Sequence, residues 1–245
     1  MQNKVNISNI SLNFGRETIL KNVSFDIEEK KPVCVIGHGS SGKTSLLKCI
    51  VGLIKPSKGS IKFENKNKKT PLNFFSEITS NDIGVVFQKD ALFDSLSVWQ
   101  NIMFKNLYKK SKKQNIKDSI NLLEMVDLSD EVVNLYPDEL SGGMKKRVAI
   151  ARAIAFKPSF LFLDEPTAGL DPVKSNIIFK IIKQLSEKMD VTVFAISSDI
   201  KGVVNNFNEI IYLQNKTIHW KGSSRNIKST KNQSLLNFIE KSNLF

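Results

Sequence analysis

The chain has 245 residues, 41% of them apolar, and a formal net charge of +12 at pH 7. This size and composition are typical of one large globular domain, and no window of about 18 apolar residues indicates a membrane span. The N-terminus is too polar for a signal peptide, and the lysines are spread without interleaved aromatics, so we expect neither secretion nor a nucleic-acid partner.

The predicted elements alternate between strands and helices. Two strand-like runs, VNISNISLNF and ILKNVSFDI, open the chain, and the apolar run PVCVIG follows as a strand buried on both faces. Next come a helix over 43–54, a turn at 56–59, a strand at 60–63, a polar loop or hairpin over 64–82 and a strand at 83–87. Cys34 and Cys49 lie in apolar runs without metal-ligand spacing, so we expect both to be reduced core residues.

The second half begins with a largely helical block at 97–157, in which Pro137 precedes a Ser-Gly-Gly turn and a helix starts near Met144. A strand at 160–163, a helix over 172–188, a strand at 191–196 and a hairpin at 209–220 follow. Alternating strands and helices predict an α/β fold with a mainly parallel sheet that helices cover on both faces. The helical block then reads as an insertion.

The motif GHGSSGKT, at 37–44, matches G-x-x-x-x-G-K-[ST] between a predicted strand and a predicted helix. Glycines let backbone N–H groups turn toward phosphate oxygens, and the helix N-terminus adds its positive dipole end. Lys43 would reach the β- and γ-phosphates, and the Thr44 hydroxyl would bind Mg²⁺. The residues expected to hold ATP here are Gly37, His38, Gly39, Ser40, Ser41, Gly42, Lys43, Thr44 and Ser45.

The motif FLFLDEP, at 160–166, is an apolar strand that ends in two carboxylates. Ligands of open parallel sheets bind at such strand ends. Asp164 would hold Mg²⁺, and Glu165 would orient and deprotonate the attacking water. A strand that ends in Asp-Glu is weak evidence alone, but together with the phosphate-binding loop it predicts a nucleotide hydrolase.

The motif LSGGMKKR, at 140–147, places Ser141, Gly142 and Gly143 at a helix N-terminus, which is a second phosphate-binding geometry. One chain has no second nucleotide for it. The motif would have a ligand if it faced the γ-phosphate held by another subunit.

In this order the motifs resemble the ATPase subunit of an ATP-binding cassette (ABC) transporter. The resemblance implies a P-loop NTPase core with an N-terminal antiparallel β subdomain and an inserted helical subdomain. It implies one nucleotide-binding domain over 1–245, with the helical part at about 88–157 and a tail at about 221–245 that contacts the partner subunit. It implies that Phe14 stacks on adenine, that Gln88 binds Mg²⁺ and faces the membrane partner, and that Asp171 in AGLD signals between the two sites. A core phenylalanine and an edge-of-strand glutamine are the plainer alternatives.

Three features resemble the Mla-type phospholipid systems and their plastid lipid-import relatives. They are the methionine in SGGMKKR, the segment FQKDALFDSLSVWQNI and the tail LLNFIEKSNLF. The resemblance implies MgATP as cofactor, a second ATPase subunit (homodimer or heterodimer), an integral membrane permease and a lipid-binding partner subunit. It implies a cytoplasmic location, peripheral on the inner membrane through the permease.

The chain departs from the family at Ser198, where the pattern has a histidine that contacts the γ-phosphate. Loss of one preorganised donor typically costs about 10²–10³-fold in rate. Three alternatives stay open: a slow enzyme in which Ser198 holds a bridging water, pairing with a different subunit that has a complete site, or an ATP-driven switch without appreciable turnover.

The sequence therefore predicts an ATP-hydrolysing subunit that energises phospholipid transport, with Glu165 and Ser198 as its catalytic residues. The first rival is an importer ATPase for another small substrate. The second is a soluble ABC ATPase without a permease.

Overall fold

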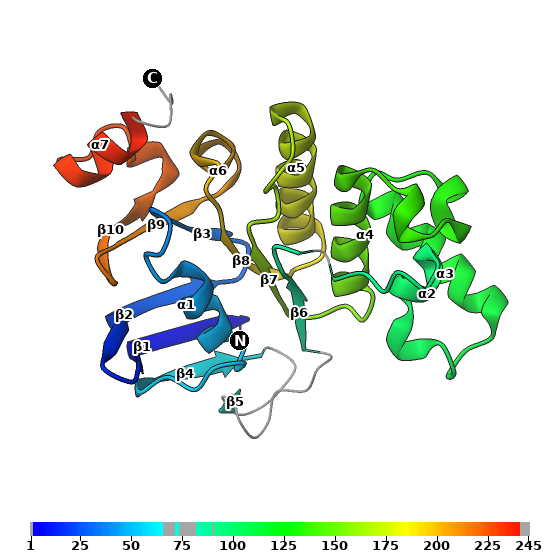
Figure 1. Ribbon diagram of the computed structural model, residues 1–245, viewed down its shortest axis with the longest axis horizontal. Helices are drawn as coiled ribbons and strands as arrows, with labels where there is room; N and C mark the ends of the chain where they lie inside the picture. The colour runs from blue at the N-terminus through cyan, green and yellow to red at the C-terminus, as the bar shows by residue number, and fades with distance from the viewer. Residues whose placement is uncertain (1, 66–71, 74–81, 90, 241–245) are drawn as a thin grey trace.

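The computed structural model describes residues 2–65, 72–73, 82–89 and 91–240, which form two sheets and a group of helices (Figure 1). The strands are β1 (Lys4–Phe14), β2 (Glu17–Glu28), β3 (Val33–Ile36), β4 (Lys58–Glu64), β5 (Leu72–Asn73), β6 (Ile83–Val86), β7 (Phe160–Asp164), β8 (Thr192–Ile196), β9 (Glu209–Gln214) and β10 (Thr217–Ser223). The helices are α1 (Lys43–Ile50), α2 (Val98–Ile102), α3 (Lys112–Met125), α4 (Gly142–Ile154), α5 (Pro172–Lys188), α6 (Ile200–Asn206) and α7 (Gln233–Glu240).

The smaller sheet is antiparallel, with the strand order β2-β1-β4-β5. Alternate residues of β1 are buried, because successive side chains of a strand point to opposite faces. Asn9, at φ +52°, lies where the β1–β2 register shifts, and the buried set moves there from Val5 and Ile7 to Ile10 and Leu12. This bulge keeps both halves of β1 facing one core.

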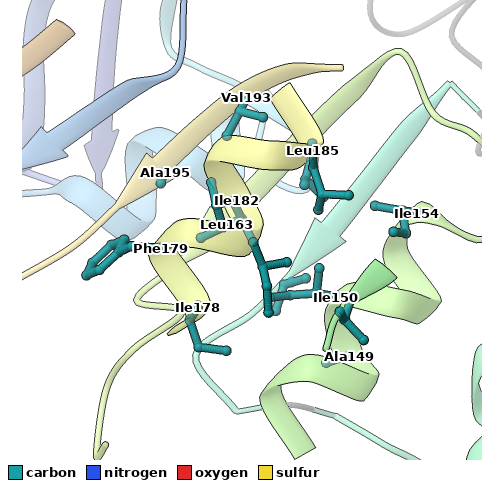
Figure 2. Close-up of a cluster of buried hydrophobic side chains, with 14 of the residues drawn as sticks. Ala149, Ile150, Ile154, Leu163, Ile178, Phe179, Ile182, Leu185, Val193 and Ala195 are labelled. Atoms are coloured by element: carbon teal, nitrogen blue, oxygen red, sulfur yellow. The ribbon is translucent and has the colours of Figure 1, made fainter. Parts of the chain in front are cut away.

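The larger sheet has the order β10-β9-β3-β8-β7-β6, and only β10 runs antiparallel to its neighbour. β3, β7 and β8 are buried along their whole length, as their continuous apolar runs predict. One face packs with α1 and the smaller sheet in a single hydrophobic cluster. Residues of α4, α5 and α6 cover the other face, and Figure 2 shows side chains of α5 packed between those of α4 and β8.

The carboxyl ends of three parallel strands meet at one edge of this sheet. Ile196 of β8 is paired with Val35 of β3 on one side and with Asp164 of β7 on the other. The loops that follow these strands are the phosphate-binding loop, the Asp-Glu pair and the segment of Ser198. The parallel topology therefore brings the phosphate-binding loop, the Asp-Glu pair and Ser198 together.

The helical part comprises α2, α3, α4 and three short 3₁₀ turns at Phe104–Asn106, Asp130–Asn134 and Pro137–Glu139. Serines begin its longer helices: Ser111 Oγ accepts from Gln114 N (3.2 Å), and Ser141 Oγ accepts from Met144 N (3.3 Å). Such side chains satisfy N–H groups that have no intrahelical partner. No helix among the described residues is long and apolar enough to cross a membrane.

The structure differs from the sequence-based expectations mainly at helix boundaries. α1 stops at Ile50 rather than Ile54, because Gly52 adopts φ +73° and Leu53 N turns back to Lys48 O. α4 begins at Gly142, and α6 was not predicted. Within the polar loop 64–82 only β5 is described between residues 65 and 82, so most of that prediction lies outside the described residues. Both cysteines are free and buried, as expected.

Candidate nucleotide-binding site

The loop after β3 is shaped to hold phosphate. A Cβ on Gly37 would lie 2.2 Å from Leu213 O, and one on Gly42, at φ +99°, would lie 2.9 Å from Ile19 O. Only glycine fits both positions, so the loop can turn tightly. No side chain caps α1, which leaves the N–H groups of its first turn free to bind an anion. A cavity of about 270 Å³ opens there, lined by Glu17, Ile19 and Ser40–Ser45.

Lys43 is nearly buried beside this loop, and its Nζ donates to the carbonyls of Gly37 (2.9 Å) and His38 (3.0 Å). Burial lowers the pKa of its ammonium group, and the nearby carboxylates of Glu165 and Asp164 oppose that shift. The two hydrogen bonds thus hold the ammonium group at the phosphate loop.

Thr44 and Asp164 meet across the site, where Thr44 Oγ1 donates to Asp164 Oδ1 at 3.2 Å. Burial raises the pKa of the Asp164 carboxyl, and the hydrogen bond from Thr44 opposes this. A hydroxyl and a carboxylate at this distance are oxygen ligands of the kind that Mg²⁺ prefers, with water and substrate phosphates as the others. The uncapped α1 N-terminus and this oxygen pair fit MgATP.

Glu165 follows Asp164 in a left-handed conformation, φ +48°, which places its carboxylate beside the loop after β8. Its Oε2 accepts from Ser198 N (2.8 Å) and Ser198 Oγ (2.9 Å), and its own N donates to Ile196 O (2.9 Å). The bridging water at Ser198, one of the three alternatives, stays a prediction; in the structure the Ser198 hydroxyl donates to Glu165. Ser198 therefore orients the carboxylate in this arrangement.

Ser141, Gly142 and Gly143 lie outside the lining of the phosphate-loop cavity. They begin α4 next to α5 and the loop that leads into it: a Cβ on Gly142 would lie 3.8 Å from Leu170 Cδ2, and one on Gly143 would lie 3.5 Å from Lys174 Cδ. Asp171 caps α5 by accepting from Lys174 N (3.0 Å), which with the Lys174 side chain lowers the pKa of its carboxyl. The serine-glycine motif and the AGLD loop thus form one surface.

Gln88 and Phe14 are both exposed. Phe14 is 52% exposed and pairs across the β1–β2 turn with Glu17, which lines the phosphate-loop cavity. This placement leaves its ring open to a planar ligand. Gln88 follows β6, and its backbone carbonyl oxygen accepts a hydrogen bond from Lys146 Nζ (2.5 Å).

Sequence reasoning missed two residues near the site. Lys146 is buried within α4 and fastens the helical part to the segment of Gln88. Phe238 of α7 lies 4.6 Å, ring to ring, from His38 in the phosphate loop. Lys146 is the second lysine of MKKR, but the motif does not indicate that its side chain is buried. No feature of the local sequence around Phe238 indicates its contact with His38.

The fold and the phosphate loop define a P-loop nucleotide-binding protein. A family model described as ABC transporter matches residues 20–168, more than half of the chain. The chain belongs to the ABC transporter family.

Its relatives carry names that refer to several substrates. The chain is 44% identical over 182 residues, 70% of its length and 52% of the relative's, to Protein TRIGALACTOSYLDIACYLGLYCEROL 3, chloroplastic, of Arabidopsis thaliana. It is 31% identical to the methionine import ATP-binding protein MetN of Clostridium tetani, over 98% of this chain and 76% of the relative. It is 30% identical to the intermembrane phospholipid transport system ATP-binding protein MlaF of Haemophilus influenzae, over 98% of this chain and 91% of the relative.

Solved cassettes share the fold. A dimeric bacterial ABC transporter cassette matches with a TM-score of 0.78 and 29% identity, over 90% of this chain and 99% of that chain. A dimeric post-hydrolysis cassette bound to ADP and phosphate matches with a TM-score of 0.77 and 30% identity, with the same coverage. As a member of this family the chain is an ATP-hydrolysing subunit with Mg²⁺ as cofactor, and such cassettes work as dimers with a membrane permease.

Proposed function

We propose that this chain hydrolyses ATP to energise phospholipid transport through a separate permease. The observation that carries the hydrolytic mechanism is the hydrogen bond between Thr44 and Asp164, which joins the phosphate loop to the last residue of β7, directly before Glu165. MgATP supplies a γ-phosphoryl group that is activated for attack by water. Thr44, Gln88 and Asp164 would hold the metal ion, and Lys43 would bind the β- and γ-phosphates.

Glu165 accepts the proton of the attacking water, and Ser198 positions the Glu165 carboxylate. A general base must lie within hydrogen-bond reach of the proton that it takes. The two donors of Ser198 bind one carboxylate oxygen, Oε2, and the other oxygen is left to receive that proton.

A second subunit completes each site. Ser141, Gly142 and Gly143 present a helix N-terminus outside their own chain's cavity, and a partner's γ-phosphate gives it a ligand. Two identical chains suffice for this arrangement, and a different cassette with the same phosphate loop would suit it as well. Adenine stacks on Phe14, and Asp171 connects the two sites.

The permease docks in a groove between β6, α2 and α4. This cavity of about 330 Å³ is lined by aromatic residues and two basic residues, among them Phe87, Phe93, Phe104, Phe156, Lys105 and Arg152. Phe93 and Phe104 stack at 4.6 Å and are 43% and 46% exposed, which is more apolar surface than a solvated loop needs. Gln88 lies just after β6, so closure around ATP would move this groove. Docking there would hold the chain at the cytoplasmic face of the membrane.

The support for a lipid substrate is the similarity to two relatives. The 44% identity is to a protein named after a galactolipid, and MlaF is named for phospholipid transport. The methionine in SGGMKKR and the segment after Gln88 also resemble the Mla-type phospholipid systems. A lipid-binding partner subunit would then deliver or accept the lipid on the permease's other side.

The test is reconstitution of the native complex. The tagged chain is purified with its permease, placed in liposomes that contain a fluorescent phospholipid, and assayed for ATP-dependent movement of that lipid. Lys43→Ala should abolish it, because it removes the ammonium group at the phosphate loop. Lys55→Ala, an exposed lysine outside the site, should leave it unchanged.

Two outcomes would replace this proposal. ATP-dependent uptake of methionine, cystine or spermidine without lipid movement would make the chain a solute importer's ATPase. Purification without any permease, with full ATP turnover by the chain alone, would make it a soluble ABC ATPase.

A further inference from the structure

An aromatic contact links the phosphate loop to α7. The His38 ring meets the Phe238 ring edge-on at 4.6 Å between centroids and 71° between planes. Phe238 in turn stacks on Tyr212 of β9 at 5.1 Å and 27°. Tyr212 pairs with Ile36, the last residue of β3 before the loop.

Buried side chains and hydrogen bonds fix α7 to the rest of the chain, so the position of Phe238 beside His38 is well defined. Leu235 and Ile239 are completely buried in the main hydrophobic cluster. Asn232 begins the helix by accepting from Leu235 N (2.9 Å), while its own Nδ2 donates to His219 O (2.9 Å). Ser234 Oγ donates to Gln214 Oε1.

His38 connects Phe238 to Lys43, the cation expected to bind the phosphates. Its carbonyl oxygen accepts from Lys43 Nζ (3.0 Å), next to the bond from the same Nζ to Gly37 O (2.9 Å). Gly37 itself packs against the backbone of Leu213 in β9. β9 therefore holds the start of the loop, and α7 holds its second residue.

We propose that Phe238 is a positioning residue for MgATP: through His38 it holds the phosphate loop and Lys43 ready for the phosphates. The expected contact of this tail with a partner subunit stays a prediction, and the role proposed here for α7 concerns its own chain's site. A loop that is already ordered loses less conformational freedom when it binds, which favours affinity. Neither Asp164 nor Glu165 depends on this contact, so Phe238 affects nucleotide binding more than the chemical step.

The test is a double-mutant cycle on the purified chain, with MgATP affinity measured by equilibrium titration. We expect Phe238→Ala and His38→Ala each to weaken MgATP binding by about threefold to tenfold, or roughly 0.7–1.4 kcal/mol. The double variant should be no weaker than the worse single variant, because both changes remove the same contact. KM should rise while kcat changes little, and Phe238→Tyr, which keeps the ring, should restore affinity.

Leu236→Ala is the matched control. It truncates an apolar side chain of the same helix, and this side chain belongs to neither hydrophobic cluster. It should leave MgATP affinity at the parent value. Circular dichroism checks that each variant is folded at the assay temperature, and His38→Ala tests the contact without touching α7. Unchanged affinity in His38→Ala, additive losses in the double variant, or equal loss in Leu236→Ala would each overturn the proposal.

Discussion

Ser198 stands where the family pattern has a histidine, and both of its donors bind the same oxygen of Glu165, at 2.8 and 2.9 Å. The hydroxyl is several atoms shorter than an imidazole and is occupied by this carboxylate. We therefore expect the hydroxyl to bind Glu165 rather than a γ-phosphate. The arrangement keeps the base in place but leaves the transition state with one donor fewer.

We predict that Ser198→His raises ATP turnover by at least about tenfold, equivalent to roughly 1.4 kcal/mol off the barrier. The imidazole would add a preorganised donor beside the γ-phosphate, and such donors act on the transition state. MgATP affinity should change much less, because the phosphate cradle is unchanged. Steady-state phosphate release by the purified chain, and again by the complex with its permease, is the measurement.

A parent rate already near the enzyme median of about 10 s⁻¹, with no gain in the variant, would show that Ser198 is no defect. The serine would then be a sufficient positioning residue, and the missing donor would come from elsewhere in the dimer.

At the scale of elements, the join between the helical part and the parallel sheet depends on α4. Lys146 is 5% exposed, and its ammonium group donates to Gln88 O across 58 residues of sequence. Lys145, one position earlier, is more exposed and faces another direction on the helix. The two lysines therefore make a matched pair for testing how α4 is fastened to the segment after β6.

We predict that Lys146→Met lowers the free energy of unfolding by about 1.5–3 kcal/mol, the usual contribution of a hydrogen bond to a charged group. Methionine keeps the apolar stem but removes the donor and leaves the Gln88 carbonyl without it. Lys145→Met should stay within about 0.5 kcal/mol of the parent, as substitutions away from such contacts do. Urea unfolding followed by circular dichroism measures both, and equal effects would argue against a structural role for Lys146.

At the scale of the whole molecule, the residues of the proposed site are divided between two surfaces of the chain. The phosphate-loop cavity lies at the edge of the parallel sheet, whereas Ser141–Gly143 begin α4 beside the AGLD loop and outside that cavity. In the proposed two-subunit site, this helix N-terminus would bind the ATP that a second subunit holds. ATP binding and dimer formation are then linked, since a ligand that binds the dimer more tightly than the monomer must favour the dimer.

We predict that Glu165→Gln forms a stable dimer with MgATP, because the amide keeps the shape of the site and removes the base that ends the closed state. Analytical ultracentrifugation should show the larger species with MgATP and the smaller one without it. The double variant Lys43→Ala/Glu165→Gln should stay monomeric, since it lacks the cation that binds the phosphates. A monomeric profile for Glu165→Gln at saturating MgATP would contradict the two-subunit site.

Much of the fold could be predicted from local sequence. The apolar runs of β3, β7 and β8 mark buried strands, because only a strand covered on both faces tolerates unbroken apolar residues. The helix expected over about 172–188 corresponds to α5, because the apolar residues at 178, 181, 182 and 185 recur at helical spacing; the structure adds that Asp171 caps it. Lys43, Thr44 and Asp164 could be named because spacing and flanking elements determine which backbone groups face the phosphates.

The tertiary structure alone decided how these residues are held. The contacts of Ser198 with Glu165, of Lys146 with Gln88, and of Phe238 with His38 join residues that are 33, 58 and 200 positions apart. No local pattern specifies such a contact, because it depends on the order of strands in the sheet and on the face that a helix buries. The chemistry of the site was therefore legible in short motifs, whereas its rigidity comes from packing between distant parts of the chain.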